Sequence, residues 1–152
     1  MGQYQLSING ETRQIDIADD TPLLYVLRNE LGLNSPRFGC GLEQCGACRV
    51  ELNGELVYSC NTTIAAAHQG AVTTVEGISR GDELHPLQKA ILEVNAGQCG
   101  YCLSGMVMAA RELLRVVPRP TREQIQQALN PHLCRCGSHN RIIRAIQSTV
   151  DN

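Results

Sequence analysis

Apolar and polar residues alternate at the start of the chain, between residues 3 and 17, as they do in strands with one buried face. Asn9 and Gly10 interrupt this alternation. An Asn-Gly dipeptide between two alternating runs is the strongest short-range signal for a two-residue β-hairpin. The pattern therefore predicts that two antiparallel strands open the fold.

A second hairpin is predicted by the runs at residues 49–52 and 55–60, because Asn53 and Gly54 separate them. Residues 72–75 form one more short apolar run and predict a further strand. The first half of the chain therefore predicts a small mixed sheet.

One helix is predicted to lie across this sheet. Thr21 can cap it, Pro22 suits its first position, and leucine and valine residues form an apolar stripe along it. Gly32 is expected to end it, because glycine readily adopts the left-handed conformation found beyond helix ends.

The apolar period changes from two to about 3.6 after the loop of residues 77–81, which is rich in Gly, Ser and Asp. Thr121 and Gln124 form a capping box, and Asn140 is expected to cap the last helix. The change of period predicts two domains, residues 1–79 and 80–152, and an α+β fold. Four helices are expected in the second domain, at residues 86–95, 105–116 and 121–129 and from Asn140 onward.

The composition indicates that something other than large aromatic side chains stabilises these two small units. Aromatic residues make up 3% of the 152 residues, with one Phe and no Trp, whereas there are eight cysteines. The N-terminal residues lack a basic start followed by an apolar run, and no stretch is apolar enough to span a membrane. We therefore expect a cytoplasmic protein, in which thiols stay reduced and cysteines serve as metal ligands rather than disulfides.

Charge is spread unevenly along the chain. The net charge of −2 argues against a nucleic-acid partner, yet residues 105–152 hold seven of the 13 basic residues and all seven are arginine. Arg111, Arg115 and Arg119 are spaced by four. We interpret them as a solvated helix face, with a protein-binding or phosphate-binding surface as the alternative.

The first four cysteines match a known metal-binding pattern. Cys40, Cys45 and Cys48 follow the C-x4-C-x2-C spacing of plant-type 2Fe-2S ferredoxins, and Cys60 supplies the distant fourth ligand. Glycines interleave these ligands in FGCGLEQCGAC, so the backbone can approach a cluster closely. A zinc knuckle or buried thiols are the alternatives.

The second set consists of Cys99 and Cys102, then Cys134 and Cys136. This spacing does not fit a zinc ribbon, which has two C-x2-C pairs 15 to 20 residues apart. Each pair lies beside a predicted helix start, where free N–H groups favour an anionic thiolate cluster. Two facing helix starts could share one 2Fe-2S cluster, although spacing alone leaves zinc open.

Three segments, FGCGLEQCGAC, QCGYCLSGM and LCRCGSHNRI, in this order and spacing resemble the small iron-sulfur subunit of the molybdenum hydroxylases, the xanthine oxidase and aldehyde oxidoreductase family. The resemblance covers nearly the whole chain. It implies a β-grasp, plant-type ferredoxin-like domain followed by a four-helix domain, each with one 2Fe-2S cluster. Departures such as Leu103, Ser104 and His132 move the likeness toward bacterial isoquinoline, nicotinate or aldehyde dehydrogenases.

The resemblance also implies the ligand sets. The outer cluster would be held by Cys40, Cys45, Cys48 and Cys60, and the inner one by Cys99, Cys102, Cys134 and Cys136. His132 and His139 invite comparison with Rieske centres, but each cluster already has four cysteines. We therefore interpret both histidines as structural or interface residues.

A contact with a second cofactor is implied as well. Gln98 would contact the pterin of a molybdenum cofactor, either molybdopterin or molybdopterin cytosine dinucleotide, and Cys136 and Gly137 would approach it. That cofactor would be held by a large molybdenum-binding partner subunit, and an FAD or cytochrome subunit could complete the hetero-oligomer.

The expected function is electron transfer from the molybdenum cofactor of the partner through two 2Fe-2S clusters to an acceptor. The chain would belong to an oxidoreductase complex acting on an N-heteroaromatic compound or an aldehyde, with no catalytic residue of its own. A free-standing ferredoxin-like shuttle and a zinc-stabilised interaction module are the alternatives.

Overall fold

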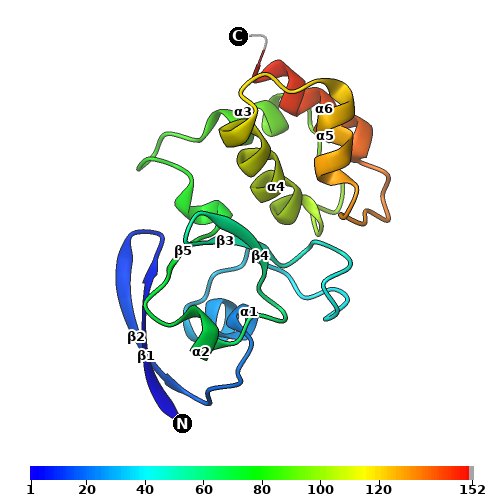
Figure 1. The fold of residues 1–152 in the computed structure, drawn as a ribbon. Coiled ribbons are helices and arrows are strands. Elements are labelled where there is room, and N and C mark those ends of the chain that lie inside the picture. Colours follow the sequence, from blue (N-terminus) through cyan, green and yellow to red (C-terminus); the bar gives the residue numbers. More distant parts are fainter. Residues whose placement is uncertain (151–152) are drawn as a thin grey trace.

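The computed structural model of the chain describes residues 1–150, which form a sheet-containing unit and a helical unit in contact with each other (Figure 1). The first unit is built on one five-stranded sheet with the strand order β2-β1-β5-β3-β4. The second contains four helices of eight residues or more. The predicted change from strands to helices along the chain is confirmed.

Both predicted hairpins are present. β1 (Gly2–Ile8) pairs antiparallel with β2 (Glu11–Ile17), and β3 (Arg49–Leu52) pairs with β4 (Glu55–Tyr58). Both turns place an Asn and a Gly at positive φ, as two-residue hairpins of this twist require. β5 (Ala71–Thr73) lies between them, parallel to β1 and antiparallel to β3.

The helix predicted after the first hairpin differs from the expectation. It consists of one α-turn, α1 (Leu23–Tyr25), followed by a π-helical segment, η1 (Val26–Glu30). Thr21 does not cap it, because the first N–H groups bind the chain after β4: Leu23 donates to the Thr62 carbonyl at 2.7 Å. Gly32 ends the helix at a φ of +69°, as predicted.

Two further details of this unit were not predicted correctly. β4 ends at Tyr58, so Cys60 lies in the turn after the strand rather than within it. A short helix, α2 (Ile64–Ala67), follows this turn, and the Thr63 side chain accepts a hydrogen bond from Ala66 N at 3.2 Å. α1 and α2 lie beside each other in Figure 1. The fully buried side chains of this unit include Leu6, Leu23, Leu27, Val50, Ile64 and Val72.

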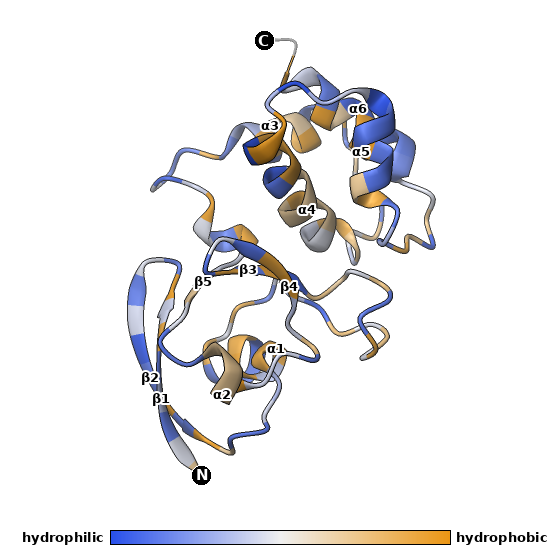
Figure 2. Ribbon diagram, in the orientation of Figure 1, coloured by the Kyte–Doolittle hydropathy of each residue, from blue (hydrophilic) through white to orange (hydrophobic). Residues whose placement is uncertain are grey.

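The second unit contains α3 (Pro86–Glu93), α4 (Leu103–Val116), α5 (Arg122–Leu129) and α6 (His139–Ser148), after a 3-10 turn, η2 (Val75–Gly77). The Thr121–Gln124 capping box is confirmed. The predicted Asn140 cap is wrong: Ser138 precedes α6, and Asn140 lies inside the helix, where its side chain accepts from Arg122. Hydrophobic residues of α3 and α4 line the interior of this unit (Figure 2).

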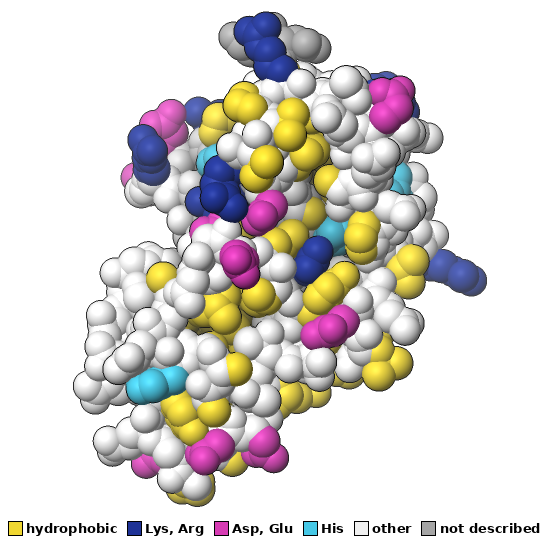
Figure 3. All heavy atoms as spheres, in the orientation of Figure 1, with side chains coloured by type: hydrophobic (Ala, Val, Ile, Leu, Met, Phe, Trp, Pro, Cys, Tyr) yellow, Lys and Arg dark blue, Asp and Glu magenta, His cyan; other side chains and the backbone are white. Residues whose placement is uncertain are grey.

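The two units meet through α4, which packs on β3 and β4. Arg111 forms an ion pair with Glu51, and Arg115 Nη2 donates to the Gly54 carbonyl at 2.8 Å. Both arginines therefore link the units, although Arg115 is exposed. Arg119 is exposed too, but it lies beyond the end of α4, so the three arginines do not form the solvated helix face that their spacing predicted. Figure 3 shows basic and acidic side chains close together where the units meet.

Among residues 1–150, no helix combines the length and the apolar character that a membrane-spanning segment needs.

Candidate iron-sulfur sites

The first three cysteines lie on an irregular loop between η1 and β3, and hydrogen bonds hold its beginning in place. Arg28 Nη1 donates to the Pro36 carbonyl at 2.8 Å, and Arg37 N donates to the Ala47 carbonyl at 3.0 Å. Glu76 accepts from Ser35 N at 2.8 Å. Burial alone would raise the pKa of Glu76, but hydrogen bonds from Ser35 and Thr74 outweigh it and lower the pKa, so the carboxylate stays charged.

Glycine is required at several positions of this loop. Gly41 and Gly46 have φ values of +68° and +75°, which L side chains rarely adopt. A Cβ atom at Gly39 would lie 2.6 Å from the sulfur of Cys45. The glycines between the cysteines therefore give the sulfurs the close backbone surroundings that the sequence predicts.

The loop directs backbone N–H groups at two sulfurs, and Cys45 Sγ accepts one of them, from Cys40 N at 3.3 Å. Cys40 Sγ accepts from Leu42, Gln44 and Cys45 N–H groups at 3.2 to 3.3 Å. Burial raises the pKa of Cys40, but these hydrogen bonds outweigh it and lower the pKa to about 7. Such a site favours a thiolate, and hydrogen bonds to sulfur are one of the ways in which proteins tune an iron-sulfur cluster.

The fourth cysteine of the first set comes from a different segment. Cys60, in the turn after β4, contacts Cys48, which is buried just before β3. Burial raises the pKa of Cys48 to about 12, and the neighbouring Cys60 and Cys45 thiols add to this. Several thiolates can share such a space when positive metal ions offset their charge, and the donor set therefore fits a 2Fe-2S cluster.

The second set of cysteines lies at two facing loops of the helical unit. Cys102 immediately precedes α4 and contacts Cys134, which lies between α5 and α6. Cys99 contacts Cys136 in the same way. The predicted placement of both pairs beside helix starts is therefore confirmed.

Backbone N–H groups again stabilise sulfur charge in this set. Burial raises the pKa of Cys134, but hydrogen bonds from Ser138, Cys102 and Cys136 together outweigh it and lower the pKa; among them, Ser138 N donates to Cys134 Sγ at 3.4 Å. The pKa of Cys99 is lowered mainly by the Tyr101 N–H. Burial instead raises the pKa of Cys102 to about 12. All eight cysteines are free thiols, and among residues 1–150 no three His, Cys, Asp or Glu side chains surround the position of a single metal ion.

Comparison with known proteins identifies the family. Family models match a 2Fe-2S iron-sulfur cluster binding domain at residues 6–74 and a 2Fe-2S binding domain at residues 74–147. One subunit of nicotinate dehydrogenase from Pseudomonas putida is 44% identical over 146 residues, which cover 96% of this chain and 93% of that protein. The alpha subunit of isoquinoline 1-oxidoreductase from Brevundimonas diminuta is 45% identical over 140 residues, 91% of each.

The chain belongs to the iron-sulfur subunits of the molybdenum hydroxylase family.

Solved structures agree with this assignment. Quinoline 2-oxidoreductase from Pseudomonas putida 86 matches 99% of this chain and 94% of its own, with a TM-score of 0.94 and 32% identity. Aldehyde oxidoreductase from Desulfovibrio desulfuricans matches 99% of this chain and 17% of its own, with a TM-score of 0.92 and 37% identity. These comparisons confirm the predicted α+β fold and the two 2Fe-2S domains. They also confirm the electron-transfer role in an oxidoreductase complex, against a free-standing shuttle and a zinc-stabilised module.

The residues predicted to face a second cofactor lie together in this iron-sulfur subunit. Gln98 Nε2 donates to the Cys136 carbonyl at 2.9 Å, and both Gln98 and Gly137 are exposed. Gly137 has a φ of +71°, so a side chain there would be strained. The chain therefore presents this edge of the second cysteine set at the surface.

His132 was predicted as a structural or interface residue, and the structure places it between the two cysteine loops. Only 2% of its surface is exposed, and its ring lies against Gly46. Burial lowers the pKa of His132 to about 4, and the charge of Arg49 adds to the effect, so the ring is neutral near pH 7. No local pattern predicts this contact, because the two positions lie far apart along the chain.

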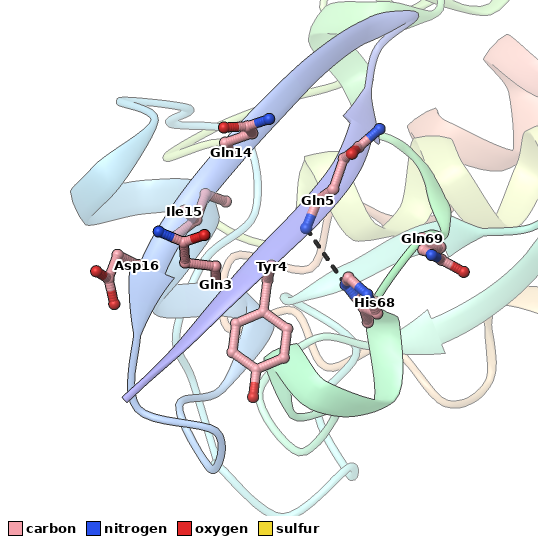
Figure 4. Close-up of a pocket in the computed structure, with 8 residues that line it drawn as sticks. All are labelled: Gln3, Tyr4, Gln5, Gln14, Ile15, Asp16, His68 and Gln69. Atoms are coloured by element: carbon pink, nitrogen blue, oxygen red, sulfur yellow. Dashed lines mark hydrogen bonds between the residues drawn. The ribbon is translucent and has the colours of Figure 1, made fainter.

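A polar hollow of about 380 Å³ lies on β1 and β2 beside the end of α2 (Figure 4). Its side chains include Tyr4, whose ring packs edge-on against His68 at 5.5 Å, and Gln5 N donates to His68 Nδ1 at 3.3 Å. None of the predicted site residues lines it. The two cysteine loops are therefore the candidate sites of this chain.

Proposed function

We propose that each cysteine set holds one 2Fe-2S cluster. The observation that carries this assignment is the pairing of sulfurs across distant segments, Cys48 with Cys60 and Cys102 with Cys134, in loops whose N–H groups point at sulfur. The proposed ligands are Cys40, Cys45, Cys48 and Cys60 for one cluster, and Cys99, Cys102, Cys134 and Cys136 for the other.

Two single substitutions test these ligand sets. Cys45→Ser and Cys102→Ser should each remove one of two distinguishable EPR signals of the reduced protein and lower its iron content from about four to about two per chain. Ser7→Ala, in β1, serves as the control and should keep both signals. Stoichiometric zinc in place of iron, or an unchanged spectrum in either cysteine variant, would contradict the assignment.

We further propose that this chain assembles with a large subunit that binds a molybdenum-pterin cofactor, molybdopterin or its cytosine dinucleotide form. Gln98, Cys136 and Gly137 would face the pterin, and their common exposed edge supports this. The cofactor, when bound, supplies the substrate oxidation. Electrons would then enter at the second cysteine set and leave from the first.

Gln98→Ala tests the pterin contact. Loss of the amide removes a polar group from the proposed interface, so turnover of the assembled complex should fall while iron content and both EPR signals remain. Gln14→Ala, on the hairpin, is a matched control with an exposed glutamine. Equal turnover of the Gln98 variant and the wild-type complex would refute the contact.

The relatives suggest the chemistry of the complex. Their names include nicotinate, isoquinoline, quinoline and aldehyde, so we propose that the complex oxidises an N-heteroaromatic compound or an aldehyde. We further propose that an FAD or cytochrome subunit receives the electrons, because this chain would carry them one at a time and needs an acceptor. We also propose a cytoplasmic location, in keeping with eight free thiols. Turnover of the purified complex with pyridine, quinoline and aldehyde substrates tests the substrate class.

We propose that the domains divide at residues 1–79 and 80–152. Val72 is the last buried residue of the sheet core, and Ile78, next to the proposed boundary, packs on the helices, so residues 73–79 join the two units. Limited trypsin digestion should cut after Arg80, which is exposed, before it cuts within either unit.

A further inference from the structure

The two cysteine loops touch each other directly. Leu133 N donates to the Cys45 carbonyl at 3.0 Å, and Leu133 is the neighbour of Cys134 in the chain. A member of the first cysteine set is therefore connected to a member of the second by one hydrogen bond and one intervening residue.

The surrounding contact leaves no room for side chains. A Cβ atom at Gly105 would lie 2.0 Å from the Gly46 carbonyl oxygen, and a Cβ atom at Gly46 would lie 2.4 Å from Cδ2 of His132. The backbone of the first loop is therefore enclosed between the start of α4 and the His132 ring.

The His132 ring is only weakly hydrogen-bonded. Among the described residues neither ring nitrogen makes a hydrogen bond of ordinary geometry, and the Leu129 and Gly105 backbones interact with the ring as weak partners. The main chain is anchored instead: His132 N donates to the Leu129 carbonyl at 2.9 Å, and the His132 carbonyl contacts His139 Nε2 at 2.9 Å. The ring atom nearest to Gly46 is the carbon Cδ2, so this contact depends on the shape of the ring.

We propose that His132 is a positioning residue for electron transfer between the two cysteine sets. Its flat ring presses on Gly46 and so keeps the Cys45 carbonyl within hydrogen-bond distance of Leu133 N. With both clusters bound, one electron at a time would cross this bridge, one cluster being oxidised as the other is reduced, and no bond would form or break. The proposal rests on the ligand assignment made above.

The test uses the iron-loaded protein and three variants. His132→Ala should retain two clusters, but it should weaken the magnetic splitting between them in EPR spectra of the fully reduced protein and slow electron transfer between them several-fold. His132→Phe keeps a flat ring, so it should restore the magnetic splitting and the electron-transfer rate towards the wild-type values. Val116→Ala removes only an exposed side chain at the C-terminal end of α4, so it should leave the splitting and the rate unchanged.

The outcomes separate this proposal from the ligand assignment. Wild-type protein that fails to load two clusters would contradict the ligand assignment. Two loaded clusters with unchanged splitting and rate in His132→Ala, even with a lower melting temperature, would show a purely structural role and overturn the positioning role. So would a Phe variant that behaves like the Ala variant. If the Ala variant does not fold, His132→Val is measured by the same criteria.

Discussion

At the scale of single residues, glycines decide how closely the two units approach. Gly105 lies in the first turn of α4, where an alanine would ordinarily raise helix stability by about 1 kcal/mol. The structure shows why glycine stands there: the position of its missing Cβ is occupied by the backbone of Gly46. Backbone atoms cannot rotate away as a side chain can.

Gly105→Ala should therefore destabilise the protein by about 1–3 kcal/mol, the usual cost of overpacking, despite its better helix propensity. Chemical unfolding measures this change. Gly97→Ala is the matched control, because its new Cβ would meet only the end of the Leu103 side chain at 3.3 Å. A Gly105 variant as stable as the wild type would show that the two backbones do not touch in solution.

At the scale of elements, the start of a helix depends on which acceptors bind its first backbone N–H groups. The Thr121 side chain accepts from Gln124 N at 3.3 Å, and the Gln124 side chain accepts in return, so α5 begins as its local pattern predicts. Thr21 has an equally suitable position in sequence, but the N–H groups of α1 bind carbonyls of the segment after β4 instead. A tertiary contact replaces the local cap.

Thr121→Ala should accordingly lower the free energy of unfolding by about 1 kcal/mol, the typical value of a helix cap. Thr21→Ala should cost only a few tenths, roughly the range of an ordinary surface substitution. Thermal unfolding of the two variants in parallel makes the comparison. Equal losses would mean that Thr21 caps α1 after all.

At the scale of the whole molecule, the helical unit is held on the sheet by charged side chains as well as by glycine contacts. The Arg111 and Glu51 side chains are 28% and 15% exposed, and their ion pair crosses from α4 to β3. Arg37 also stacks over the Tyr101 ring at 5.2 Å, and the Tyr101 hydroxyl donates to the Phe38 carbonyl. These contacts fix the relation between the two cysteine loops.

A double-mutant cycle with Arg111→Gln and Glu51→Gln should give a coupling energy of roughly 1 kcal/mol. Exposed ion pairs usually give less, and this pair should reach the top of their range because water screens it less. The exposed pair of Arg13 and Glu11 provides the comparison and should give a coupling near zero. Unfolding free energies of the single and double variants supply the measurement. A coupling no larger than that of the exposed pair would contradict a linking role.

Local chemistry made much of this protein predictable. Hairpin turns need residues that tolerate positive φ, so Asn9-Gly10 and Asn53-Gly54 located both hairpins. Spacing divided the eight cysteines into two sets, because cluster ligands on one loop must recur at short intervals. Neither inference needs knowledge of distant residues.

Only the tertiary structure decided what depends on distant residues. It turned the predicted helix at residues 22–31 into α1 and η1, brought Arg111 to Glu51, and placed His132 on Gly46. Each of these results depends on segments far apart in the chain, which form a hydrogen bond, an ion pair or a packing contact that no local pattern encodes. Local pattern determined both hairpins and the cysteine sets, whereas contacts between distant segments determined the form of α1 and η1 and how the two sets face each other.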